Sequence, residues 1–144
     1  MDEAKRIRLL DAMLRIMPDF EIGREMRAAQ NEEWGRELLL AGDREDALEK
    51  FQACAEEKKA ILAKREKNAN SEENWADVAK QRQELARNYL GIAILARSLK
   101  RLDAARLACE TTLAILAEIR VAGETASGEI AAIREEAELI LKKL

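Results

Sequence analysis

The 144-residue sequence contains no histidine, one proline, six glycines and only 3% aromatic residues. Without histidine, the chain lacks the side chain that most often acts as general acid, general base or metal ligand near neutral pH. Such scarce glycine and proline leave few positions for the tight turns of a β-sheet protein. Because few turns are available, the sequence predicts an all-α fold. Because aromatic residues are scarce, leucine, isoleucine, alanine and methionine must fill its core.

An excess of charge of one sign is also missing. The net charge is −3 and residues of both signs are interspersed, which argues against a nucleic-acid-binding surface or a polybasic membrane patch. No apolar run approaches the roughly 20 residues that span a bilayer. The first residues, MDEAKRIRLLDAML, lack the small-residue cleavage site of a signal peptide. We therefore expect a cytoplasmic protein that binds neither nucleic acid nor membrane.

Motifs of catalysis are missing as well. The chain has no glycine-rich phosphate loop and no nucleophile elbow, and Ser98 and Ser127 have no obvious base partner. The two cysteines, Cys54 and Cys109, fall on apolar helix faces and are interpreted as small buried hydrophobic residues. A disulfide would need an oxidising compartment, and a metal site would need further ligands. We expect no catalytic residues, no cofactor and no metal.

A helix–turn–helix pattern is present between Trp34 and Leu62, WGRELLLAGDREDALEKFQACAEEKKAIL. Gly42 suits the left-handed position that follows a helix, and Asp43 suits the N-cap of the next helix. Gly35 and Ala47 are small where two helices must approach closely.

These residues resemble a tetratricopeptide repeat. The family pattern places a large and a small residue, here Trp34-Gly35, before a turn glycine, here Gly42. A small residue and an aromatic follow, here Ala47 and Phe51. The match covers about one repeat.

A second, more divergent copy centres on Lys100, 58 positions after Gly42. Ile92-Ala93 precede it, and Ala105 and Cys109 follow it. The spacing exceeds the roughly 34 residues of the standard repeat. The resemblance therefore implies a long-helix variant, in which about six helices form antiparallel hairpins stacked as a short α-solenoid. A closed helical bundle is the alternative fold.

The predicted organisation is a single domain, 1–144. Its expected parts are an N-terminal cap helix (1–18), a first helical pair (19–69), a second helical pair (70–122) and a C-terminal capping helix (123–144). The first helix is expected to end before Pro18 and to pack through a stripe of Leu9, Ala12, Met13 and Ile16. Docking a second subunit is the alternative role of this helix.

Helix starts are expected at Asp19, Ser71 and Asp103, each as an N-cap. The second helix is expected to break near Gln30-Asn31. The fifth helix is expected to run to about Ala122. A connection is predicted at Gly123 and Glu124–Gly128, followed by a helix with Ile130, Ile133, Ala137, Ile140 and Leu144 on one side.

The family resemblance also implies a groove for a protein segment on the first helix of each pair. Its predicted residues are Glu32, Arg36, Leu39, Leu40, Arg87, Leu90, Ile94 and Arg97. Such a surface suits an amphipathic segment with acidic flanks. A receptor for a peptide C-terminal carboxylate is not expected, because Glu32 stands where the family's clamp has lysine. Alternatively, the first or last helix covers these apolar residues.

Two functions follow from this pattern. The first is a non-enzymatic protein–protein interaction adaptor or chaperone-like module with a protein or peptide partner. The second is a structural subunit whose apolar helix faces form a permanent homo- or hetero-oligomer.

Overall fold

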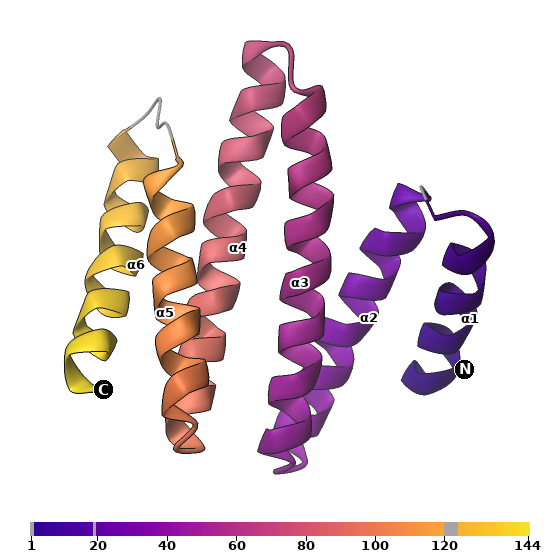
Figure 1. Cartoon of the computed structure of the whole chain (residues 1–144), viewed down its shortest axis with the longest axis horizontal. Coiled ribbons are helices and arrows are strands. Elements are labelled where there is room, and N and C mark those ends of the chain that lie inside the picture. The colour runs from indigo at the N-terminus through magenta and orange to yellow at the C-terminus, as the bar shows by residue number, and fades with distance from the viewer. Residues whose placement is uncertain (1, 19, 120–123) are drawn as a thin grey trace. The chain divides into compact units, whose positions relative to one another are not determined.

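The computed structural model describes residues 2–18, 20–119 and 124–144, with side chains for all of these except 124–127. These residues form six helices and no strand, so the predicted all-α class is confirmed (Figure 1). The helices are α1 (Glu3–Ile16), α2 (Glu21–Leu40), α3 (Arg44–Asn68), α4 (Glu72–Ser98), α5 (Leu102–Ala117) and α6 (Glu124–Lys143). None of the described helices combines the length and the apolar character needed to cross a membrane.

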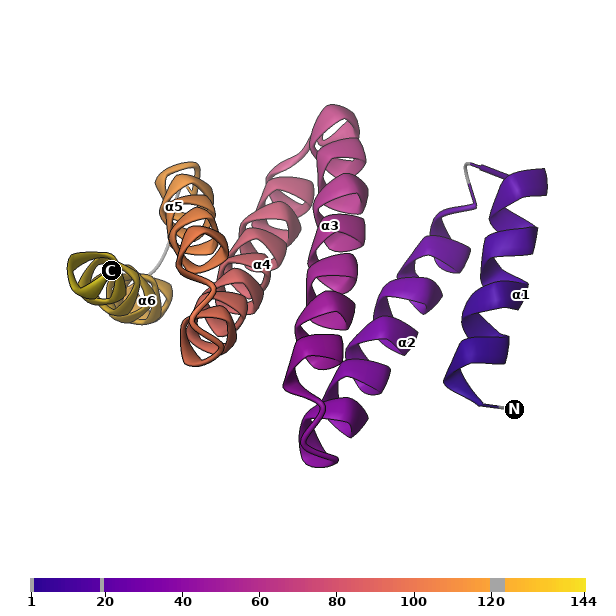
Figure 2. The same cartoon turned by 60° about the horizontal axis from the view of Figure 1, so that its bottom comes forward.

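The chain divides into two compact units, Met1–Ala63 (unit 1) and Lys64–Leu144 (unit 2), and the division falls inside α3. In unit 1, α1 lies beside α2, and the first part of α3 completes the unit. In unit 2, α5 lies between α4 and α6 along most of their lengths, as both views show (Figures 1 and 2).

Unit 1 depends on a close approach of α2 and α3. A Cβ atom on Gly35 would lie 2.8 Å from Cε1 of Phe51. Any other residue at this position would therefore force the phenyl ring to move. Ala47 is fully buried, and Ala28 of α2 is 2% exposed. The prediction that Gly35 and Ala47 permit close helix packing is therefore confirmed.

Unit 2 has an aliphatic core. Val78 and Leu85 of α4 are each 2% exposed, and Leu116 of α5 is 1% exposed. The last helix buries the side chains of Ile130, Ile133, Ala137 and Ile140. The apolar stripe predicted for this helix is confirmed at these four positions, which recur every three or four residues on one helix face.

The α2–α3 turn has the hydrogen bonds of a Schellman motif. Gly42 adopts φ +88°, a backbone conformation without steric penalty only for glycine. The amide of Asp43 donates to the carbonyl of Leu38 (2.9 Å), and the amide of Gly42 donates to Leu39 (3.1 Å). These bonds satisfy carbonyls that the helix end would otherwise leave unpaired.

The α4–α5 turn repeats this geometry. Lys100 adopts φ +60°, and it and Gly42 are the only described residues with positive φ. The amide of Arg101 donates to Ala96 (2.9 Å), and the amide of Lys100 donates to Arg97 (3.0 Å). Every partner stands 58 positions after its counterpart in the first turn. The predicted turn at Lys100 is confirmed, although lysine replaces the glycine.

Of the three predicted helix caps, one is confirmed, one is wrong and one lies outside the described residues. Ser71 caps α4 as predicted, accepting a bond from the amide of Asn74 at 3.1 Å. Asp103 is not a cap, because the Lys100 turn starts α5 at once and places Asp103 in its first helical turn. The cap position belongs to Arg101, whose side chain makes no capping bond. The predicted cap Asp19 lies outside the described residues.

Two helices are also longer than expected. Helix α2 continues through Gln30-Asn31 without the predicted break, since Asn31 is buried at 8% exposure and packs as part of the helix face. Helix α6 begins at Glu124, where a connecting segment was predicted. Helix α5 is shorter than expected, because it ends at Ala117 with Glu118 as its C-cap rather than near Ala122.

The packing face of α1 was predicted wrongly. Leu10 and Leu14 are buried, whereas Leu9 is 52% exposed and Ile16 is 81% exposed. The helix is turned about its axis relative to the prediction, and polar bonds to α2 accompany this orientation. Arg6 bonds to Gln30 and Asp11 bonds to Arg27, and these two α1 residues flank the buried leucine stripe.

Exchanging the turn residues tests the role of the left-handed backbone. Left-handed backbone costs a non-glycine residue roughly 1–2 kcal/mol, and glycine loses about 0.5–1 kcal/mol of unfolded-chain entropy. We therefore expect Lys100→Gly to stabilise the protein by about 0.5–1 kcal/mol in urea unfolding. Gly42→Ala should destabilise it by about 1 kcal/mol. Ser98→Gly, inside the last turn of α4, is the control and should lower stability. A stabilising Ser98→Gly, or a destabilising Lys100→Gly, would contradict the role given to the turn.

Candidate functional site

The predicted groove residues of unit 1 lie on the second half of α2. Arg36 extends from the helix surface (67% exposed side chain) and pairs with Glu32 at 3.0 Å. Glu32 also lies 3.6 Å from the ammonium group of Lys58 on α3. At the end of the helix, Leu39 is 42% exposed and Leu40 is 90% exposed. Unit 1 therefore presents a short edge of one arginine and two leucines to solvent.

The predicted groove residues of unit 2 lie on α4, and they do not share one environment. Ile94 is 47% exposed and Arg97 is exposed. Leu90 is buried, with 7% exposure. Arg87, three residues before Leu90 on the same helix face, pairs with Glu129 of α6 at 2.8 Å. Leu90 is therefore closed to a partner, and the Arg87–Glu129 pair joins α6 to this part of α4.

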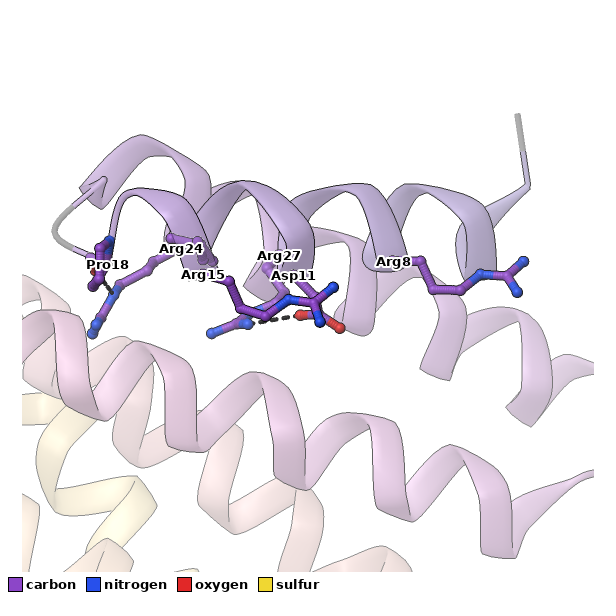
Figure 3. A pocket seen from close by; sticks show the side chains of 7 residues that line it. Arg8, Asp11, Arg15, Pro18, Arg24 and Arg27 are labelled. Atoms are coloured by element: carbon purple, nitrogen blue, oxygen red, sulfur yellow. Dashed lines mark hydrogen bonds and ion pairs between the residues drawn. The ribbon is translucent and has the colours of Figure 1, made fainter.

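A hollow that the sequence analysis did not identify lies between α1 and α2 in unit 1. Its volume is about 610 Å³. Figure 3 shows the arginine side chains on one side of the helix pair. We call the hollow the arginine cleft, and it is lined by Arg8, Asp11, Leu14, Arg15, Pro18, Arg24 and Arg27. A signal was present in the sequence, because Arg8, Asp11 and Arg15 recur at the spacing of one helix edge.

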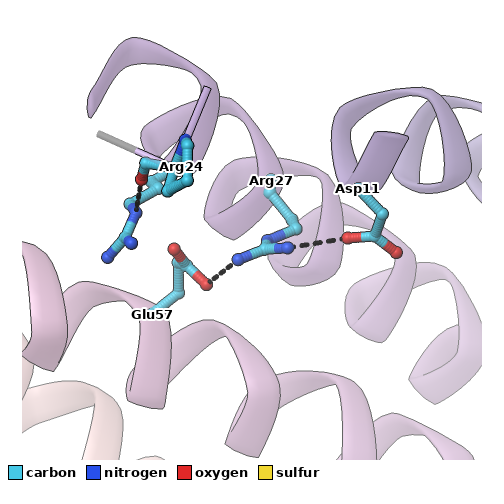
Figure 4. A network of polar contacts seen from close by, with 5 residues as sticks. Asp11, Arg24, Arg27 and Glu57 are labelled. Carbon is cyan, nitrogen blue, oxygen red and sulfur yellow. Dashed lines mark hydrogen bonds and ion pairs between the residues drawn. The ribbon is translucent and has the colours of Figure 1, made fainter. Parts of the chain in front are cut away.

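Arg27 ties three helices of unit 1 together (Figure 4). Its two terminal nitrogens bond to Asp11 of α1 and to Glu57 of α3, each at 2.7 Å. Burial lowers the pKa of Arg27, but the hydrogen bonds and charges of both carboxylates outweigh burial and raise the pKa overall. The second oxygen of Glu57, Oε1, is buried without a hydrogen-bond partner among the described residues. Both terminal nitrogens of Arg27 are therefore occupied by contacts within the protein.

Arg82 has a similar bridging role in unit 2. Its guanidinium bonds to Glu66 at the end of α3 (3.1 Å) and to the carbonyl of Glu118 after α5 (3.1 Å). The ring of Trp75 lies 5.9 Å away and is 47% exposed. Trp75, Arg82 and Glu118 border a hollow of about 560 Å³, in which the arginine is already engaged by protein groups.

Three carboxylates gather at the other end of the α1–α2 pair. Ligand oxygens of Glu3, Glu33 and Glu37 all lie within 4.8 Å of one another. Burial raises the pKa of Glu37, repulsion from Glu3 and Glu33 and a hydrogen bond with Glu3 raise it further, and Arg6 opposes the rise. Glu33 and Glu37 are exposed and Glu3 is half-buried; such a trio of carboxylates is not by itself a metal site, so we assign the cluster electrostatic repulsion only.

Both cysteines are free and buried, as the interpretation of small hydrophobic residues requires. Burial raises the pKa of the Cys109 thiol, and the charge of Glu110 adds to the rise. A thiol held protonated in this way is a poor nucleophile and a poor metal ligand.

No protein-family model matches the chain, and neither a curated protein nor a solved structure was found to be similar to it. Its function must therefore be inferred from its own geometry.

Replacing Arg27 tests its structural role. Arg27→Gln removes two charge-assisted bonds and leaves Glu57, whose side chain is 14% exposed, without its partner. We expect a loss of about 1–3 kcal/mol in urea unfolding. The control, Arg36→Gln, removes an exposed pair within one helix and should change stability by no more than about 0.5 kcal/mol. Equal effects of the two variants would contradict the bridge.

The carboxylate cluster predicts a pH-dependent effect. Because the folded pKa of Glu37 is raised, the folded protein binds this proton more readily than the unfolded chain, and the ionised cluster destabilises the fold at neutral pH. We expect Glu37→Gln to melt at a higher temperature than the wild type at neutral pH. The difference should vanish as the pH falls below the ordinary range of carboxyl groups. Glu49→Gln on α3 is the control, and a Glu37→Gln gain that persists at low pH would contradict the repulsion.

Proposed function

We propose that this protein is a non-enzymatic interaction module of tetratricopeptide-like design, which holds a segment of a partner protein as an adaptor or chaperone does. The repeated turn supports the proposal. The Gly42 and Lys100 turns share backbone conformation, hydrogen-bond pattern and a constant shift of 58 positions. A chain that builds the same helical hairpin twice is typical of helical repeat proteins, which bind partners on the helices of their repeats.

The exposed end of α2 carries the proposal. Leu40 is 90% exposed and follows a half-exposed Leu39, with the guanidinium of Arg36 one helical turn earlier. Burying a leucine side chain is worth about 1.5–3 kcal/mol, so a partner that covers these residues gains affinity. At the corresponding end of α4, Ile94 and Arg97 are also exposed. An amphipathic segment with acidic flanks complements either edge.

A structural subunit is the second candidate. Ile16 is 81% exposed, and Ile22 and Met26 of α2 are 62% and 50% exposed. Such side chains on α1 and α2 would suit a permanent contact with another subunit. Sedimentation separates the two proposals, because a monomer across micromolar concentrations favours the adaptor and a tight oligomer favours the subunit.

Partner capture tests the adaptor. We expect the tagged full-length chain to retain a specific partner from a lysate of its native host, identified by mass spectrometry. The purified partner should then bind Arg36→Glu/Arg97→Glu at least about tenfold more weakly than the wild type, with unchanged helix content and melting temperature.

The matched control is Arg44→Glu/Arg106→Glu, which changes the net charge equally at exposed arginines on the other helix of each pair. This control should bind as the wild type does. Unaltered binding in the Arg36/Arg97 variant, or an equal loss in the control, would remove the assignment of these edges.

A further inference from the structure

The arginine cleft of unit 1 contains more arginines than are paired with other groups of the described structure. Among its four arginines, Arg27 is engaged by two carboxylates. Arg24 donates only its Nε, to the carbonyl of Pro18 at 3.1 Å, so both terminal nitrogens lack a hydrogen bond to a described residue. Arg8 and Arg15 are exposed and make no hydrogen bond or ion pair with any described residue. Three guanidinium groups are therefore available to a ligand.

The spacing of these groups defines what they can hold. Arg8 and Arg15 stand seven residues apart on α1, which places them about 10 Å apart along the helix. Arg24 lies across the hollow on α2, beside Pro18, as Figure 3 shows. A guanidinium group binds a carboxylate through two parallel hydrogen bonds. The cleft thus offers two guanidinium groups from α1, those of Arg8 and Arg15, and a third from α2, that of Arg24.

The surrounding charge limits the ligand to a short one. Acidic residues outnumber basic residues in 1–63, and the carboxylates of Glu3, Glu33 and Glu37 gather elsewhere on the same helix pair. A long polyanion such as a nucleic acid would meet this negative charge beyond the cleft. A short segment needs only the hollow of about 610 Å³, whose lining also includes the apolar side chains of Leu14 and Pro18.

From this geometry we infer that the arginine cleft binds an acidic segment of another protein, with Asp or Glu carboxylates seated on Arg8, Arg15 and Arg24. The site is independent of the exposed edges at Leu39–Leu40 and Ile94. Arg27 organises it, because its bond to Asp11 neutralises the one carboxylate among the described lining residues, which would otherwise repel the ligand. Binding is expected to weaken steeply with salt, as exposed charge pairs do.

The test uses the full-length chain and a fluorescein-labelled peptide of repeated Asp-Glu-Ala triplets, followed by fluorescence anisotropy. We expect saturable binding that falls at least about tenfold in Arg8→Gln/Arg15→Gln and less in Arg8→Lys/Arg15→Lys, which keeps the charge but loses the paired donors. Arg44→Gln/Arg106→Gln, at exposed arginines outside the cleft, should bind within about twofold of the wild type. Since Arg8 and Arg15 have no partner among the residues that the structure describes, their variants should keep the melting temperature.

Three outcomes would overturn the inference. The first is equal binding of a peptide of repeated Asn-Gln-Ala triplets. The second is undiminished binding by Arg8→Gln/Arg15→Gln. The third is equally tight binding of a thymidine oligonucleotide of the same charge that the same substitutions weaken, which would make the cleft a general polyanion site. Retention of peptide binding in Arg36→Glu/Arg97→Glu separates this site from the edges of the proposed function.

Discussion

The left-handed backbone at Gly42 and Lys100 is the constraint on which the rest of the structure depends. A chain made of helices this long has few places to reverse, and each reversal must satisfy the carbonyls at a helix end. Both turns do so with the same pair of amide bonds. Five positions after each turn residue stands a fully buried alanine, Ala47 or Ala105, so each turn delivers a small side chain to the contact between its two helices.

The arginines of the structure have two roles. Arg27 and Arg82 each bind groups from two other helices of their own unit, and the acceptors leave them little freedom. Removing such a residue strands a partly buried carboxylate, which is why these bridges matter more than their net electrostatic energy indicates. Arg8 and Arg15 lie exposed, without a partner among the described residues, on a chain of net charge −3. Exposed charges contribute little to stability, so the fold does not require these two arginines.

Local chemistry explains what could be predicted from the sequence. Pro18 ends the first helix, Gly42 permits the turn, and the hydroxyl of Ser71 caps α4. Each of these effects acts within a few residues. The turn at Lys100 could be predicted only by analogy with Gly42, since lysine has no local preference for positive φ.

Tertiary contacts explain what could not be predicted. The buried face of α1 is set by its packing on α2, where Leu10 and Leu14 are buried and Arg6 and Asp11 make bonds, and helix periodicity alone does not reveal this packing. Leu90 is buried in the packing of unit 2, and its neighbour Arg87 pairs with Glu129 of α6, a residue far along the chain. The arginine cleft likewise needs two helices at once, because Arg8 and Arg15 acquire a shared environment with Arg24 only when α1 packs on α2.

Nuclear magnetic resonance of the backbone around Lys100 tests the central claim most directly. Chemical shifts and amide–Hα couplings report φ at residues 42 and 100, and hydrogen exchange reports whether the amides of Asp43 and Arg101 are bonded. The two-hairpin account predicts positive φ at both turn residues and protection of both amides. A helical, negative φ at Lys100 with an unprotected Arg101 amide would contradict it, because the second turn would then differ from the first.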